Sequence, residues 1–398
     1  MLSATKAKIA VAKERLVVFC GAGFSKCAGI PLMDEFAETL RDGDHLDTAD
    51  QYEFDAIQRT CNDLGSYIQE SARNLEHLSS FLDVLQMSNP RFLFEGCKKY
   101  KTPELASAFV KECIRRVTHP PLASVQARHA NNLCKLATSV HLSVITTNYD
   151  LHLELGSLDL DSKVRARPTP SILACTTASC GDSLYWTDPE TSFDIFKLHG
   201  SVNWYSDDDG LAVHGLIHEV PQSKANSLAH RIILETGGNV TPHDPSTCLL
   251  SPPSVIKPRI EPLLKDQWEG AANALMQADR LWFIGYSFPQ SDSFMRYFLA
   301  STLCRNVRLK QIVIIDKNLA TIRERAMPLL ESPQHRGRVY AMPGLWHRVD
   351  LNGLLLDDLD QAAQFIATGT GYVSYVDLLE SALDEEKTLA RHRGQSGS

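Results

Sequence analysis

Near its start the chain reads Leu16-Val17-Val18-Phe19-Cys20-Gly21-Ala22-Gly23-Phe24-Ser25, an apolar run that enters a turn with two glycines. A short apolar run bounded by glycine is typical of a buried strand. Three more apolar runs end in turns of small or polar residues: Leu142–Ile145 before Thr146-Thr147-Asn148-Tyr149-Asp150, Phe196–Leu198 before His199-Gly200-Ser201, and Leu281–Ile284 before Gly285-Tyr286-Ser287. Ligands bind outside the carboxyl ends of strands in an open parallel α/β sheet, so we expect the four endings to form one cleft.

The composition is that of an ordinary globular protein. Of the 398 residues, 43% are hydrophobic and 22% are charged, and no apolar run reaches the roughly 18 residues that a membrane span requires. The length exceeds the usual single core, so we expect one large domain with insertions, or a domain with an appendage. The first residues lack the apolar centre of a secretory signal, and we therefore expect a cytoplasmic protein.

Net charge and cysteine spacing narrow the possible partners. The formal net charge of −8 argues against direct nucleic-acid binding by this chain alone. The ten cysteines are scattered, and the nearest candidate pair for a metal, Cys175 and Cys180, lacks a matching second pair. We expect reduced, mostly buried thiols and no structural zinc.

The order of elements predicts an α/β core with a large helical insertion. Residues 2–14 favour a short helix, and Pro31 to Leu40 favours another. Residues 51–136 are almost wholly helical in pattern, with apolar residues at three- and four-residue spacing. This insertion is long for a crossover between parallel strands, so we expect it to form a lobe over one edge of the sheet.

The α/β pattern resumes in the second half of the chain. Residues 157–190 are expected to form loops or a small β element, and a hairpin turn is expected near Asp207–Gly210. Residues 213–247 give no clear pattern. We expect strands at 281–284, 311–315 and 338–341, and helices at 265–278, 291–302 and within 359–393.

The predicted fold class is α/β, a Rossmann-like parallel sheet with a large helical insertion and C-terminal helices. The predicted boundaries are a core of residues 1–50 and 137–350, a helical lobe of residues 51–136 and a C-terminal helical segment of residues 351–398.

The glycine turn suits a phosphate group. Gly21 and Gly23 would let backbone amides approach a diphosphate, and Ser25 would add a hydroxyl donor. A full dinucleotide fingerprint requires a third glycine where Lys26 stands, and an acidic strand end about 20 residues on, where the chain reads as helix. An ordinary Rossmann dehydrogenase is therefore disfavoured. A tight strand-to-helix turn that binds nothing is the alternative.

Polar residues at the other strand ends each allow two interpretations. Asn148 would grip a ribose hydroxyl and a water, or would cap a helix that begins near Asp150. His199 would be a general base near neutral pH, or a hydrogen-bonded structural residue. Ser287 and Asp316 fit a ribose or phosphate contact and fit a cap equally well. Their order in the chain and their shared position at strand ends favour ligand contacts in one common site over separate structural roles.

That order resembles the sirtuin superfamily, whose signatures are a Gly-Ala-Gly-x-Ser loop, a Thr-x-Asn-x-Asp segment, a His-Gly pair, a Gly-x-Ser strand end and a later ribose-binding strand end. The resemblance spans roughly residues 15 to 345. The chain supplies the signatures as Gly21 to Ser25, Thr146 to Asp150, His199-Gly200, Gly285 to Ser287, and Asp316.

Two departures distinguish the chain from the protein deacylases of that superfamily. Gly29-Ile30-Pro31 matches the segment after the glycine loop, but Leu32-Met33-Asp34-Glu35 replaces the Asp-Phe-Arg of the deacylases. The four-cysteine zinc module expected after the histidine is missing as well. With the context Leu198 to Trp204, the chain looks more like the bacterial sirtuin-like branch that hydrolyses NAD in antiphage defence.

The resemblance implies an NAD+ glycohydrolase that cleaves NAD+ to nicotinamide and ADP-ribose without zinc. His199 would polarise a ribose hydroxyl or assist water, and Asn148 would orient ribose or water. Because nicotinamide is already a cationic leaving group, positioning the dinucleotide and a water would suffice. The other implied substrate contacts are Gly21, Ala22, Gly23 and Ser25 at the diphosphate, Gly285, Ser287 and Asp316 at the adenosine side, and Thr147 and Asp150 beside Asn148.

Partners and alternatives also follow from the resemblance. Members of that branch act alone, fused to other domains, or beside a HerA-type ATPase or a short Argonaute, and a stand-alone chain of this length most resembles the HerA-associated type. We expect a homo-oligomer formed through residues 2–14 or the 51–136 lobe, with activity restrained until assembly or infection. The alternatives are a zinc-independent protein deacylase and a non-catalytic sensor of NAD or ADP-ribose.

Overall fold

The computed structural model describes most of the core of the chain. The described residues are 13–42, 45–66, 72, 74–118, 127–158, 165–167, 192–207, 210–213, 248–251, 264–289, 292–330, 338–343, 346–349, 351–356 and 373–374. The predicted helix within 2–14 lies outside this set apart from residues 13 and 14, and the pair Cys175 and Cys180 and residues 214–247 lie outside it as well. Of the helices predicted within 359–393, only residues 373–374 are described, and they form a short strand, so the helical prediction is wrong at these two residues.

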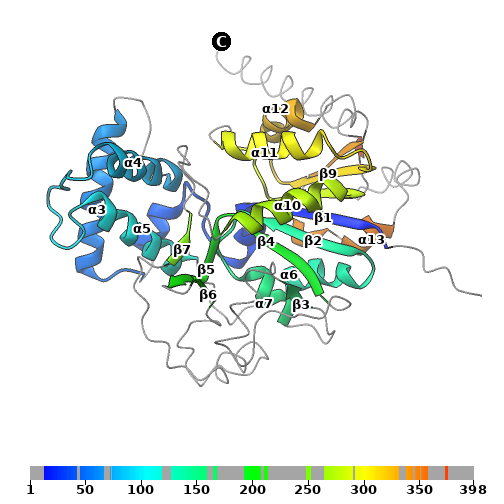
Figure 1. Ribbon diagram of the computed structural model, residues 1–398, viewed down its shortest axis with the longest axis horizontal. Coiled ribbons are helices and arrows are strands. Elements are labelled where there is room, and N and C mark those ends of the chain that lie inside the picture. The colour runs from blue at the N-terminus through cyan, green and yellow to red at the C-terminus, as the bar shows by residue number, and fades with distance from the viewer. Residues whose placement is uncertain are drawn as a thin grey trace, which may run out of the picture.

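The core is a sheet of eight strands in the order β11-β10-β9-β8-β1-β2-β4-β3 (Figure 1). Every neighbouring pair is parallel except β10 and β11, which are antiparallel. The strands are β1 Arg15–Cys20, β2 His141–Thr146, β3 Arg165–Arg167, β4 Ser192–Lys197, β8 Arg280–Ile284, β9 Gln311–Asp316, β10 Val339–Pro343 and β11 Val373–Ser374.

This order gives the sheet a topological switch point between β1 and β8. From β1 the chain builds one half of the sheet through β2 and β4, and it then returns to the other side of β1 through β8, β9 and β10. The run β4-β2-β1-β8-β9-β10 therefore has the 3-2-1-4-5-6 order of dinucleotide-binding Rossmann folds. The predicted Rossmann-like class is confirmed, and the glycine turn after β1 lies at the switch point.

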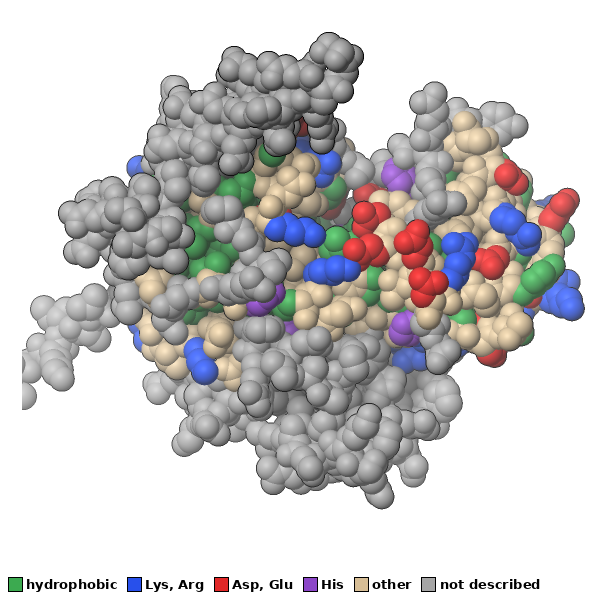
Figure 2. Space-filling model, turned by 180° about the vertical axis from the view of Figure 1, so that it is seen from behind, with side chains coloured by type: hydrophobic (Ala, Val, Ile, Leu, Met, Phe, Trp, Pro, Cys, Tyr) green, Lys and Arg blue, Asp and Glu red, His purple; other side chains and the backbone are tan. Residues whose placement is uncertain are grey.

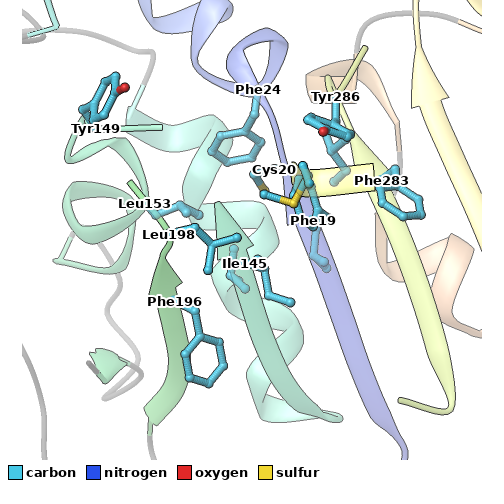
Figure 3. Close-up of a cluster of buried hydrophobic side chains, with 14 of the residues drawn as sticks. Phe19, Cys20, Phe24, Ile145, Tyr149, Leu153, Phe196, Leu198, Phe283 and Tyr286 are labelled. Carbon is cyan, nitrogen blue, oxygen red and sulfur yellow. The ribbon is translucent and has the colours of Figure 1, made fainter. Parts of the chain in front are cut away.

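The central strands are buried, as their continuous apolar runs predict. In β1, the side chains from Leu16 to Cys20 are at most 2% exposed. Aromatic side chains of β1, β8 and the turn after β8 meet, where the ring of Phe19 lies 5.6 Å from that of Phe283 and 4.7 Å from that of Tyr286 (Figure 3). This packing gives the loops above it a rigid floor.

A smaller antiparallel sheet follows directly on the histidine turn. It has the order β6-β5-β7, where β5 is Gly200–Asp207, β6 is Gly210–Val213 and β7 is Cys248–Leu250. Asp207 pairs with Gly210, so the predicted hairpin is confirmed.

Helices pack beside the sheet. Helix α10 (Lys265–Gln277) contacts β4, β1 and α11 (Ser293–Leu303), and α11 contacts α12 (Leu319–Leu330). Helices α6 (Ala127–Lys135) and α7 (His152–Leu158) pack against each other near β3. Shorter elements complete the described chain: α1 Ala22–Ser25, η1 Lys26–Ala28, η3 Leu136–Thr138, η7 Trp346–Arg348 and α13 Leu351–Leu356.

Three helices of the insertion stand apart from the sheet as a lobe, on the left in Figure 1. They are α3 (Thr48–Gly65), α4 (Leu75–Ser88) and α5 (Pro103–Val117). Side chains cap their first turns: Asp47, Asn74 and Thr102 accept hydrogen bonds from main-chain amides of α3, α4 and α5. The fourth helix of the predicted insertion, α6, lies beside α7 instead, so the helices of the lobe end at Val117.

The helix predicted from Pro31 to Leu40 begins later than the sequence indicates. Helix α2 runs from Phe36 to Asp42. The Leu32 amide donates to Glu35 Oε2 at 2.9 Å, and the Met33 carbonyl accepts from the Leu75 amide of the lobe at 3.1 Å. These contacts hold residues 31–35 in a turn between the core and the lobe. The predicted start was therefore wrong, because a tertiary contact overrides the local helical pattern.

Two further expectations concern the described residues only. None of their helices is long and apolar enough to cross a membrane. Seven of the described cysteines, at positions 20, 27, 61, 97, 113, 134 and 304, are free thiols, and of these seven all are buried except Cys27 and Cys304.

Candidate active site

The glycine turn is held against the end of β8 by main-chain hydrogen bonds. Gly21 donates its amide to the Ile284 carbonyl at 3.0 Å, and Gly23 donates to the Gly285 carbonyl at 2.9 Å. A Cβ on Gly21 would lie 2.6 Å from the Gly285 oxygen. Gly285 itself has φ near +60°, and a Cβ there would lie 2.4 Å from the Gly23 carbonyl carbon. The three glycines thus permit the close contact of two loops at the switch point.

This contact also changes what the loop offers to a diphosphate. The amides of Gly21 and Gly23 already donate to protein carbonyls, and the Phe24 amide donates to the Gly21 carbonyl at 2.9 Å. A diphosphate at this loop would therefore bind through other groups than these three amides. The assignment of Gly21, Ala22, Gly23 and Ser25 to the diphosphate stays a prediction.

Asn148 connects the end of β2 to the glycine turn. Its Nδ2 donates to the Gly21 carbonyl at 2.9 Å and to Ser25 Oγ at 3.0 Å. A carbonyl only accepts, so the contact with Gly21 fixes which way the amide points. Among the described residues, none donates a hydrogen bond to Asn148 Oδ1. The alternative interpretation of Asn148 as a helix cap is wrong, because Asp150 Oδ1 accepts from the His152 amide at the start of α7, at 2.9 Å.

A pocket opens beside Asn148. It holds about 480 Å³, including the part open to solvent. Its polar lining groups come mainly from the glycine turn and from the segment Thr147 to Asp150, whereas the lining residues from positions 30–36 and from Leu75 and Ile114 are apolar. The lining residues are Ala22, Ser25, Ile30, Pro31, Leu32, Met33, Phe36, Leu75, Ile114, Thr118, Thr147, Asn148, Tyr149 and Asp150. An apolar pocket with a few polar groups on one side is suited to a small flat ring that carries a polar substituent.

The helical lobe closes part of this pocket. Leu75 belongs to α4, Ile114 belongs to α5, and Thr118 follows directly after α5. Near the pocket, Lys26 and Glu35 form an ion pair. Burial raises the pKa of the Glu35 carboxyl, but Lys26 and the Leu32 amide outweigh burial, and the pKa lies below its usual range. Acidic and basic side chains face one another in the middle of the molecule in Figure 2.

His199 lies in the turn between β4 and β5 and is only 2% exposed. Its ring centroid is 6.2 Å from that of Tyr149 and 6.3 Å from that of Trp268. The Leu198 amide donates to the Thr146 carbonyl at 3.0 Å, which joins the end of β4 to the end of β2. The structure therefore brings His199 beside the neighbour of Asn148 but does not place it in the wall of the pocket.

Ser287 and Asp316 lie farther along the same edge of the sheet. The Gly285 amide donates to the Ile315 carbonyl at 3.1 Å, which joins the ends of β8 and β9. Asp316 ends β9 and accepts from the Asn318 amide at 2.8 Å, and burial raises the pKa of its carboxyl. Ser287 is exposed. Neither residue lines the pocket, and their contacts with a ribose stay predictions.

Two residues that hold the site were not predicted from the sequence. Lys197 is buried and donates to the Tyr149 and Asp150 carbonyls and to Glu154. A lysine inside the apolar run Phe196–Leu198 was the available signal, because an unpaired lysine is almost never fully buried. The second residue, Trp346, donates its indole N–H to the Phe24 carbonyl at 3.0 Å and stacks on the Phe24 ring at 4.3 Å. No local pattern marks Trp346.

Comparison with known proteins gives no family for the chain. No family model matches it, and no curated protein matches it. Among solved structures it is similar to a mutant Sir2 homologue in complex with 2′-O-acetyl ADP ribose, with 13% identity over 87% of this chain and 95% of that chain and a TM-score of 0.41. It is also similar to a mutant Sir2 homologue in complex with ADP ribose, with 14% identity over 87% of this chain and 95% of that chain and a TM-score of 0.36. At such low scores the likeness carries no argument about function, which is inferred from this chain's own residues.

Proposed function

We propose that the chain is an NAD+ glycohydrolase, which cleaves NAD+ to nicotinamide and ADP-ribose. The observation that carries the proposal is the position of Asn148, whose amide holds the glycine turn while it lines a pocket at the switch point of a Rossmann-like sheet. Dinucleotides bind at this place in such sheets. The sirtuin-like order of the strand-end motifs supports the same assignment.

The reaction asks mainly for positioning. Nicotinamide leaves as a neutral molecule from a cationic ring, so the transition state resembles an oxocarbenium ion that a nearby water captures. In the proposal the pocket beside Asn148 receives the nicotinamide ring, and its apolar wall excludes bulk water. Asn148 Oδ1 accepts from a ribose hydroxyl or from the attacking water. His199 polarises a ribose hydroxyl or assists that water. Thr147 and Asp150 contact the substrate beside Asn148. Ser287 and Asp316 contact the adenosine side of NAD+.

The biological part of the proposal rests on the resemblance alone. The segment Leu32–Glu35 lacks the arginine of the deacylases, and the sequence lacks their four-cysteine module. Both departures favour hydrolysis of NAD+ over deacylation. We place the chain among cytoplasmic antiphage effectors that deplete NAD+ without zinc, that form homo-oligomers, and that a partner such as a HerA-type ATPase regulates.

The test is nicotinamide release by the purified chain, with NAD+ and without any peptide. The incubation is run with and without the product of the neighbouring gene, and nicotinamide and ADP-ribose are separated by chromatography. Equal amounts of the two products are expected. Release only in the presence of an acyl-lysine peptide would assign a deacylase, and binding of NAD+ without its consumption in either mixture would assign a sensor.

A further inference from the structure

A lysine and a glutamate form a fully buried ion pair behind the site. The side chains of Lys197 and Glu154 are 1% and 0% exposed, and Nζ lies 3.0 Å from Oε1. The same ammonium donates to the Tyr149 carbonyl at 3.4 Å and to the Asp150 carbonyl. A lysine has three donors, so this arrangement directs the ammonium at one short segment, Tyr149 to Glu154.

Stability alone is a poor reason for this pair. Taking two charges out of water is costly, and the attraction between them often does no more than offset that cost. Burial raises the pKa of the Glu154 carboxyl, although Lys197 opposes the shift, as expected where desolvation is severe. Apolar side chains of similar size often replace such pairs without loss of stability. The specific contacts of the ammonium are the feature that an apolar pair would not reproduce.

Those contacts join the two segments that carry Asn148 and His199. Lys197 is the last residue of β4 and stands two positions before His199. Its amide donates to Gln267 Oε1 of α10 at 3.1 Å, which holds the lysine from the other side. The carbonyls that its ammonium binds belong to the two residues directly after Asn148.

The strand that follows His199 binds the same carbonyl. The Val202 amide donates to the Tyr149 carbonyl at 3.0 Å, and Ser201 Oγ donates to it at 3.3 Å. Donors on both sides of His199 in the sequence therefore converge on the residue after Asn148. Neither Lys197 nor Glu154 lines the pocket, so their influence on a bound substrate has to act through this segment.

We propose that Lys197, neutralised by Glu154, is a positioning residue that fixes the placement of Asn148 relative to His199 for the reaction. This inference rests on the proposed function. An error of about 1 Å in such a placement is sufficient to lower turnover by about 100-fold. The pair reaches the pocket wall only through the main-chain carbonyls of Tyr149 and Asp150, and neither Lys197 nor Glu154 lines the pocket itself, so the affinity for NAD+ should change little.

The test compares variants of the full chain. The double variant Lys197→Met/Glu154→Leu removes both charges and nearly keeps the volume. It is expected to keep its Tm within a few degrees, to lose about 100-fold in kcat and to change KM by less than about threefold. Glu154→Gln keeps the ammonium on the two carbonyls and should lose less turnover than the double variant. The matched control is Lys265→Met/Glu269→Leu, an exposed pair on α10 at 3.5 Å, which should leave kcat unchanged.

Three outcomes would overturn the inference. They are a stable double variant with kcat within twofold of the native chain, a loss confined to KM, and a double variant that does not fold, which would make the pair a requirement for stability. Amide hydrogen exchange separates this failure from failure of the proposed reaction. Exchange at Val202 should be at least about tenfold faster in the double variant, with Ile145 of β2 unchanged, whether or not the native chain releases nicotinamide.

Discussion

Asn148 donates its side-chain amide to Ser25 Oγ at 3.0 Å, so the residue that follows β2 holds the turn that follows β1. The two residues are 123 positions apart in the chain. This hydrogen bond and the one from the same amide to the Gly21 carbonyl link two of the motifs that the sequence suggests for one site.

Asn148→Ala should therefore reduce nicotinamide release by 100-fold or more, an effect on the order of that for the loss of one preorganised polar group in an active site. Release is measured by chromatography after incubation with NAD+, and folding is checked by near-ultraviolet circular dichroism. Asn89→Ala serves as control, because Asn89 is exposed beyond the end of α4. Turnover of Asn148→Ala within a few-fold of the native chain would reject Asn148 as a catalytic residue.

His199→Ala should also abolish nicotinamide release and leave the fold intact. The side chain is buried beside Tyr149, so a modest fall in Tm is expected in addition. His141→Ala, at the exposed first position of β2, should leave both quantities unchanged. If His199→Ala loses its structure together with its activity, the residue has only the structural role.

Gly285→Ala should lower the free energy of unfolding by about 2 kcal/mol or more, because the new Cβ would meet the main chain of Gly23 and the residue has a left-handed conformation. Gly29→Ala is a matched comparison, since Gly29 has φ near +82° but no atom within 4 Å of the added Cβ. Gly29→Ala should lower the free energy of unfolding by only the conformational strain, about 1 kcal/mol. Equal costs in urea unfolding would mean that the contact between the two loops relaxes freely.

Leu32→Trp should raise KM for NAD+ by about tenfold, because the larger side chain narrows the pocket from its apolar wall. Asp34→Trp, two residues away and exposed, does not line the pocket and should leave KM unchanged. Steady-state kinetics of both variants give the comparison. An unchanged KM in Leu32→Trp would place the nicotinamide ring outside this pocket.

The hydrogen bonds of the Glu53 carboxylate should make the stability of the lobe depend on pH. Its carboxylate accepts from the Lys98, Lys99 and Tyr100 amides at 2.7, 3.1 and 3.0 Å. Burial raises the pKa of this carboxyl, but the amides outweigh burial, and the pKa lies below its usual range. The contribution of Glu53 is thus fully present above the unfolded pKa of about 4.3 and is lost as the pH falls through the lower folded value.

Glu53→Gln should lower the free energy of unfolding at pH 7 by about 2 kcal/mol. Urea unfolding of both proteins at several pH values gives the measurement. The difference between the native chain and the variant should shrink as the pH falls below about 4. A difference that stays constant down to pH 3 would show that the charge of Glu53 contributes nothing.

The sequence was sufficient to predict the central strands β1, β2, β8 and β9, because each is a mostly apolar run buried in the sheet. The edge strands β3, with the sequence Arg-Ala-Arg, and β11 have no such run. Strands β8 and β9 begin and end within a residue of the predicted positions. The start of α2 was wrong, since Met33 is bonded to Leu75 of the lobe, and no local pattern contains that contact. The spacing of apolar residues indicates which face of a helix or strand is buried. It does not show where a helix begins when a residue distant in the sequence determines that boundary.

The candidate site was also predicted only where local sequence patterns determine it. Asn148 and the glycine turn were predicted to meet because parallel strands place their carboxyl ends at one edge. The close contact that the glycines permit was not predictable, because Gly21 and Gly23 contact Gly285, which is far away in the sequence. Lys197 and Glu154 were missed for the same reason, as they are 43 residues apart and charge patterns are read over a single helix turn.

The indole of Trp346 reaches the Phe24 carbonyl across 322 positions of the chain. During synthesis the glycine turn, Asn148 and His199 all leave the ribosome well before Trp346 does. The turn therefore obtains one of its supporting contacts only when the last strands of the parallel sheet have been made. A prematurely terminated product would contain every proposed reactive residue without that support. Under the proposed function, partial copies of the chain would therefore be less able to deplete the NAD+ of the cell.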